Sequence, residues 1–223
     1  MQRISRESSP RIYLLGESAV VIESAAPATL GCQRRIWWLA AALAHHPAVR
    51  EVVPGMNNLT VLLGSDGVDP EEFRSVMQQC WAEGGAQELS SRLVEIPVDY
   101  GGETGPDLEE VARHCGISAR EVIQRHAVAD YTVYFLGFQP GFAYLGGLDP
   151  LIATPRRAEP RLAVPAGSVG IGGAQTGIYP AVTPGGWQII GHTPLALFDP
   201  AREPPTLLLP GDQVRFVPRR STP

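Results

Sequence analysis

The most informative absence in this sequence is lysine. All 18 basic residues of the 223-residue chain are arginine. A Schiff-base lysine and the lysine of a phosphate-binding P-loop are therefore excluded. The formal net charge is −5, so the chain also lacks the basic field that holds nucleic acids, and no nucleic-acid partner is expected.

Cysteine is scarce as well. Cys32, Cys80 and Cys115 lie far apart and form no CxxC pair, which favours thiols in a reducing compartment over a disulfide framework or a zinc site. The first thirty residues show no charged start followed by an apolar run, and the longest apolar stretch, residues 36–44, is too short to cross a bilayer. These features predict a cytoplasmic protein with no metal site and no membrane partner.

The first part of the chain mixes helix and strand patterns. Apolar residues recur at helical spacing from Thr29 to about His46. A second helix is expected to start at Asp69, an N-cap residue followed by proline at the first helical position. Strand-like runs lie at 11–23, 51–53 and 59–63. Residues 1–92 are therefore predicted to form a small α+β domain.

The second part, residues 93–223, is expected to be mainly β. Strand-like runs at 93–100 and 131–138 flank two short helices, the second with a capping box from Ser118 to Glu121. From Gln139 onward, proline and glycine interrupt short apolar runs, and almost no helical periodicity remains. Many short strands separated by turns predict a closed or nearly closed β-barrel.

One stretch of the barrel half, Gly167–Pro180, is unusually rich in glycine: "GSVGIGGAQTGIYP". It is not a P-loop, because it has no lysine. It is not a dinucleotide-binding fingerprint either, since Gln175 stands where the last glycine belongs and no helix pattern follows. Glycine at this density indicates bulges and corners of a barrel, or backbone that comes close to a ligand.

Aromatic and amide residues flank glycines in three segments of this half, at 136–148, 167–180 and 183–192. Ligand pockets are largely apolar with a few convergent polar groups, so we predict that the three segments meet around one pocket. The alternative for the aromatic residues is a role in the core, and a lone histidine is usually structural. The candidate substrate-binding residues are Phe142, Tyr144, Gln175, Thr176, Trp187 and Gln188, and the catalytic candidates are His192 and Gln175.

The segments "VYFLGFQPGFAYLGGLDP", "TPRRAEPRLAVPAGSVGIGGAQTGIYP" and "TPGGWQIIGHTP" resemble the signature segments of the family of 5-oxoprolinase B subunits, also called the KipI or allophanate hydrolase subunit 1 family. The likeness extends to "IPVDYGGETGPDLEEVARHCGIS" and more weakly to "VPGMNNLTVLL", and so covers nearly the whole chain. It implies an N-terminal α+β domain followed by a cyclophilin-like β-barrel. The sequence departs from the family pattern at Ala143, Gly172 and His192, where the family more often has proline, alanine and arginine.

The resemblance also implies a function. Family members open 5-oxoproline to glutamate in an ATP-dependent complex with an A subunit and a homologous C subunit. This chain is then expected to be inactive without its partners, with a lactam as substrate and with ATP used by the complex rather than bound by this chain alone. Two alternatives remain open: a KipI-like inhibitor of a sensor histidine kinase, and a subunit of the urea carboxylase or allophanate hydrolase type.

Overall fold

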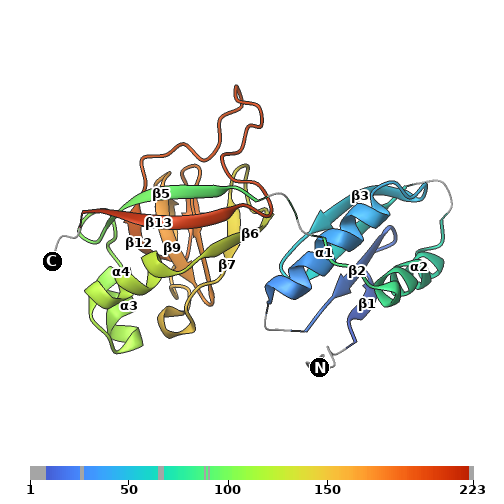
Figure 1. Ribbon diagram of the computed structural model, residues 1–223, viewed down its shortest axis with the longest axis horizontal. Helices are drawn as coiled ribbons and strands as arrows, with labels where there is room; N and C mark the ends of the chain where they lie inside the picture. The colour runs from blue at the N-terminus through green and yellow to red at the C-terminus, as the bar shows by residue number, and fades with distance from the viewer. Residues whose placement is uncertain (1–8, 26–27, 65–67, 88, 90, 221–223) are drawn as a thin grey trace. The chain divides into compact units, whose positions relative to one another are not determined.

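The computed structural model describes residues 9–25, 28–64, 68–87, 89 and 91–220. The chain divides into two compact units, Met1–Glu88 and Leu89–Pro223 (Figure 1). The expected domain boundary after residue 92 stays a prediction. Among the described residues, no helix has the length and apolar character needed to cross a membrane.

The first unit is a four-stranded antiparallel sheet with two helices. Its strand order is β1-β2-β4-β3, so the sequence neighbours β3 and β4 pair at one edge. Apolar side chains of the sheet and of both helices form its core. The elements are β1 (Arg11–Leu14), β2 (Ala19–Glu23), α1 (Leu30–Leu43), β3 (Val49–Pro54), β4 (Asn58–Leu63) and α2 (Pro70–Glu83).

The predicted starts of both helices are confirmed. The side chain of Thr29 accepts a hydrogen bond from the backbone N–H of Cys32, and the Asp69 carboxylate accepts one from Glu71. The first helix ends at Leu43 rather than at His46. Pro47 disfavours helical backbone in the residue before it, so the helix ends ahead of the proline.

The second unit is built on a closed seven-stranded barrel with the strand order β10-β7-β6-β13-β5-β12-β9 (Figure 1). The predicted barrel is confirmed and is fully closed. The apolar run at 195–198 is not a strand, and Phe198 forms only an isolated bridge with Thr206. The barrel strands and the helices that accompany them are β5 (Leu93–Tyr100), α3 (Leu108–Cys115), α4 (Ala119–Val128), β6 (Tyr131–Leu136), β7 (Ala143–Gly146), β9 (Ser168–Gly172), β10 (Gln175–Ile178), β12 (Gln188–His192) and β13 (Gln213–Arg220).

Two further pieces complete this unit. A single 3₁₀ turn, η1 (Pro150–Ile152), follows β7. A separate two-stranded ribbon pairs β8 (Arg161–Val164) with β11 (Thr183–Gly185). The ribbon leads into β9 on one side and into β12 on the other. It therefore adjoins two of the glycine-flanked segments, 167–180 and 183–192.

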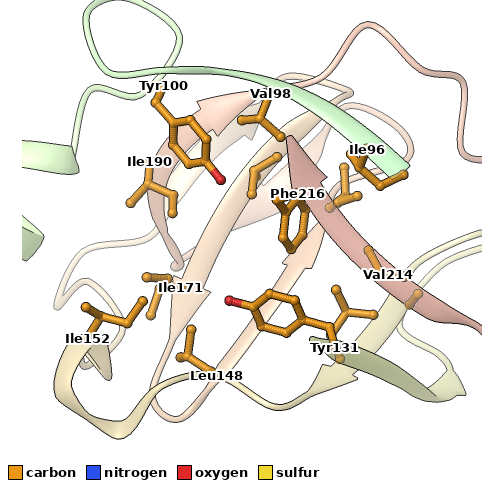
Figure 2. Packing of buried hydrophobic residues seen from close by; sticks show 14 of the residues in the cluster. Ile96, Val98, Tyr100, Tyr131, Leu148, Ile152, Ile171, Ile190, Val214 and Phe216 are labelled. Carbon is orange, nitrogen blue, oxygen red and sulfur yellow. The ribbon is translucent and has the colours of Figure 1, made fainter. Parts of the chain in front are cut away.

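The inside of the barrel is filled by side chains. Strand residues alternate between inside and outside, and the inward set of β5 meets the inward sets of β6, β9, β12 and β13 (Figure 2). The interior is thus a packed core, and a ligand site must lie on the outside of the barrel or at its ends. The labelled core residues in Figure 2 are Ile96, Val98, Tyr100, Tyr131, Leu148, Ile152, Ile171, Ile190, Val214 and Phe216.

Candidate functional site

Strand register decides which candidate residues face outward. Thr176 pairs with Leu145, and both side chains are completely buried. Because side chains alternate along a strand, their neighbours Tyr144, Gln175 and Gly177 lie on the outer face of the barrel. The candidate site therefore lies on this outer face of β7, β9 and β10.

Trp187 lies across this outer face, directly over Gly170, Gly172 and Gly177. We call these three residues the glycine seat. A Cβ added to Gly172 would lie 2.5 Å from Nε1 of Trp187, and one added to Gly177 would lie 3.1 Å from Cζ3. A Cβ on Gly170 would lie 3.2 Å from the Cβ of Trp187. The glycine density of β9 and β10 is thus explained largely by the approach of the chain's own indole ring. Gly173 has another reason, since its φ of +66° lies in the turn between the two strands.

Four aromatic side chains meet over the glycine seat, and we call them the outer aromatic cluster: Phe142, Tyr144, Tyr179 and Trp187. The ring centroid of Trp187 lies 5.5 Å from that of Phe142 and 6.2 Å from those of Tyr144 and Tyr179, in edge-to-face arrangements. Each such pair contributes about 0.5–1.5 kcal/mol beyond its burial. Tyr144 is only partly buried, so it is the member whose polar group is most accessible to a ligand.

The three glycine-flanked segments therefore do converge. The first supplies Phe142 and Tyr144, the second supplies the glycine seat, Tyr179 and the outward-facing Gln175, and the third supplies Trp187. Gln175 pairs in register with Gly172, the residue directly under the indole nitrogen. A partly buried amide thus lies beside the aromatic rings, and both can contribute to one surface.

Three other candidates do not join this surface. Gln188 is buried, and its Nε2 donates to the carbonyl of Pro155 at 3.0 Å. His192 lies at the far end of β12, where its Nε2 donates to the carbonyl of Ala166 at 3.0 Å. Thr176 points into the barrel instead of standing beside Gln175.

Thr176 instead ends a buried hydrogen-bond chain that the sequence analysis missed. Its hydroxyl donates to the carbonyl of Gly170 at 2.9 Å, so it can only accept from Nε2 of His126, also at 2.9 Å. Nδ1 of His126 then accepts from the hydroxyl of Tyr100 at 2.7 Å. His126 is therefore a neutral Nε2–H tautomer with both ring nitrogens satisfied, and its role is to hold α4 on the barrel core.

Burial inside the barrel lowers the pKa of His126 from 6.5 to about 3. Below pH 6.5, His126 is protonated in the unfolded chain but stays neutral in the folded chain. The stability that depends on neutral His126 is therefore complete above pH 6.5 and is lost as the pH falls toward 3. The free energy of unfolding falls by about 1.4 kcal/mol for each pH unit in this window, which amounts to about 2 kcal/mol between pH 7 and pH 5. We expect His126→Gln to remove this part of the pH dependence.

Urea unfolding of the barrel unit at both pH values, followed by hydrogen exchange of barrel peptides, measures the effect. His114→Gln is the matched control, since His114 is exposed on α3, and it should keep the wild-type dependence. An unchanged difference between pH 7 and pH 5 in His126→Gln would contradict the assignment.

A second missed feature is the buried carboxylate of Asp107, immediately before α3. Its Oδ1 accepts from Arg157 at 3.0 Å and from Arg161 at 2.7 Å, and its Oδ2 accepts from the backbone N–H of Ile189 at 2.6 Å. Asp107 thereby ties the segment before β8, β8 itself and β12 to the start of α3. The two arginines lie 50 and 54 residues beyond Asp107, so no short-range sequence pattern identifies their partner.

The described residues do not form a site that fits a nucleoside triphosphate with its metal ion. No group of three His, Cys, Asp or Glu side chains in the described part of the chain is arranged to hold a metal. The chain has no lysine, and its glycine-rich strands are covered by Trp187. The described residues therefore do not form a nucleotide site.

The sequence of this chain matches a known protein family. The family model described as "Carboxyltransferase domain, subdomain C and D" matches residues 10–208. The B subunit of 5-oxoprolinase from Escherichia coli O157:H7 is 58% identical over 210 residues, covering 94% of this chain and 96% of that protein. The B subunit of 5-oxoprolinase from Haemophilus influenzae is 51% identical over 206 residues, covering 92% and 96% respectively.

Solved structures show the same fold within longer chains. The crystal structure of TTHA0988 is 36% identical with a TM-score of 0.76, and the match covers 91% of this chain but only 40% of that chain. The urea amidolyase of K. lactis has a TM-score of 0.82 at 21% identity, and the match covers 94% of this chain and 15% of that chain. From its sequence and its fold, the chain belongs to the carboxyltransferase domain, subdomain C and D, family, together with the B subunits of 5-oxoprolinases.

Proposed function

We propose that this chain is the B subunit of a bacterial 5-oxoprolinase, which opens 5-oxoproline to glutamate with ATP in a complex with an A subunit and a homologous C subunit. The observation that carries this proposal is the 58% identity to the B subunit of the E. coli 5-oxoprolinase over 96% of that protein. At this identity and coverage, the two chains are expected to share their fold and their place in the complex.

The chemistry suits a division of labour. A lactam is an amide, and its resonance makes the carbonyl a poor electrophile, so coupling to ATP is what makes ring opening favourable. The donor set of this chain does not fit the nucleotide, and we assign that part of the reaction to the A subunit. The part left to this chain is to bind the lactam and shield it from water.

We propose that the outer aromatic cluster and Gln175 form this chain's share of the lactam site, completed by the C subunit. The rings of Tyr144 and Trp187 supply an apolar wall. The Gln175 amide can both donate to the lactam carbonyl and accept from the lactam N–H. Thr176, Gln188 and His192 take structural roles in this proposal, since each already has a partner within the chain.

Reconstitution tests the proposal. This chain is co-purified with the products of the neighbouring genes, and ATP-dependent glutamate release is measured for the chain alone and for the complex. Only the complex should release glutamate, and Gln175→Ala should lower kcat/KM by about tenfold or more, because it removes hydrogen bonds to the substrate. Gln124→Ala on the exposed side of α4 is the control and should match the wild type. Full activity of the chain alone, or none in any combination, would defeat the proposal.

A second candidate, which the family resemblance left open, is a role in carboxyl transfer to urea. The structural likeness to K. lactis urea amidolyase has a TM-score of 0.82. At 21% identity the likeness shows the fold alone. The same reconstituted complex assayed with urea and bicarbonate distinguishes the two functions, and we expect no urea-dependent ATP hydrolysis.

A further inference from the structure

The extended segment before β8 and the first residue of β8 carry three arginines near the outer aromatic cluster, and two of them share one carboxylate. Arg157 and Arg161 both bind Oδ1 of Asp107, whose Oδ2 is taken by Ile189. These two side chains are thus held in place by one buried anion, although Nη1 of Arg161 has no hydrogen-bond partner among the described residues.

Arg156 differs from both. Its guanidinium carbon lies 6.0 Å from the ring centroid of Trp187, and the residue is exposed. Within the described part of the chain, no carboxylate lies within ion-pair distance of it. In a chain with a net charge of −5, a cation on the face of a buried indole without an acidic partner is available to bind an anion.

Tyr144 supplies a second donor at the same place. Its ring centroid lies 6.2 Å from that of Trp187, and its hydroxyl has no hydrogen-bond partner among the described residues. Burial raises the pKa of the Tyr144 phenol, while the nearby charge of Arg156 lowers it. The phenol therefore stays protonated at neutral pH and can donate a hydrogen bond. Arg156 and Tyr144 both lie beside the ring of Trp187.

We propose that Arg156 and the hydroxyl of Tyr144 form a carboxylate-binding subsite at the edge of the Trp187 ring, which takes the carboxylate of a small lactam acid. A single guanidinium with one hydroxyl matches the single charge of a carboxylate, and the planar fork of arginine binds such a group with two parallel hydrogen bonds. Gln175 lies on the same outer face, so the carboxylate and the lactam amide of one small molecule have separate partners. This inference rests on the proposed function for the identity of the acid.

The first experiment compares 5-oxoproline with 2-pyrrolidinone, the same ring without the carboxylate, in the reconstituted complex. Arg156→Gln should raise the KM for 5-oxoproline by about tenfold to a hundredfold, since a charge-assisted hydrogen bond is lost, and should leave inhibition by 2-pyrrolidinone unchanged. Tyr144→Phe should raise the KM several-fold. Arg120→Gln, an exposed arginine on α4, is the control. A KM within twofold of the wild type in Arg156→Gln, or equal losses for both compounds, would overturn the subsite while leaving the proposed function intact.

The second experiment does not depend on turnover. The indole N–H resonance of Trp187 is followed by NMR in the reconstituted complex, without ATP, as 5-oxoproline or 2-pyrrolidinone is added. The resonance should shift with 5-oxoproline in the wild type, should not shift in Arg156→Gln, and should shift little with 2-pyrrolidinone in either protein. An unshifted Trp187 resonance in the wild type, or an equal shift in both proteins, would overturn the subsite whatever the complex catalyses.

Discussion

Replacing Trp187 by alanine is expected to destabilise the barrel unit by about 3–5 kcal/mol, the range for removing a buried aromatic side chain. Trp187 is only 4% exposed and contacts the other three members of the outer aromatic cluster. The glycines beneath it have no side chains with which to fill the space, so a cavity would remain. Because a whole domain is typically stable by about 5–15 kcal/mol, this single change should lower the urea midpoint of the barrel unit markedly.

Phe138→Ala is the matched control for this prediction. Phe138 contacts the edge of the same cluster, with its ring 5.4 Å from that of Phe142, but it is 60% exposed. Its replacement should cost less than about 1 kcal/mol, because little buried surface is lost. Trp187→Phe should fall between the two. The prediction fails if urea unfolding of Trp187→Ala, followed by hydrogen exchange of barrel peptides, matches that of Phe138→Ala.

Replacing Asp107 by alanine is expected to cost about 3 kcal/mol, because removing one partner of a buried ion pair leaves the other charge uncompensated. In this protein two arginines would lose their common anion, and the N–H of Ile189 would lose its acceptor. The side chains of Arg157 and Arg161 are 35% and 24% exposed, so water offsets part of the loss. Urea unfolding of the barrel unit measures the change.

Asp107→Asn separates the two parts of this effect. Asparagine keeps an oxygen that can accept from Ile189 but loses the charge that holds the arginines, so its cost should be clearly smaller than that of alanine. Glu109→Ala, which removes an exposed carboxylate from α3, should change stability by less than about 0.5 kcal/mol. Equal stabilities for Asp107→Ala and Glu109→Ala would show that Asp107 does not hold this part of the fold together.

The outer aromatic cluster could be predicted only in part. The three glycine-flanked segments, with Phe142, Tyr144 and Trp187, can be recognised in the sequence because glycine, aromatic and amide residues are concentrated in them. The sequence could not tell that the glycines serve the indole ring rather than a ligand, since that depends on which strand residues face outward. It also could not separate Thr176 from Gln175, because adjacent strand residues point to opposite faces and the register decides which is which.

What the sequence determined by itself was local. Thr29 and Asp69 start their helices because a capping side chain acts within two or three residues. The frequent prolines and glycines after Gln139 keep most of the strands there to five residues or fewer, with β13 as the exception. The tertiary structure alone decided the contacts between distant residues. Asp107 reaches a backbone N–H 82 residues further along the chain, and His126 meets Thr176 across 50 residues. Barrel closure brings such groups together, and no short-range preference encodes their pairing.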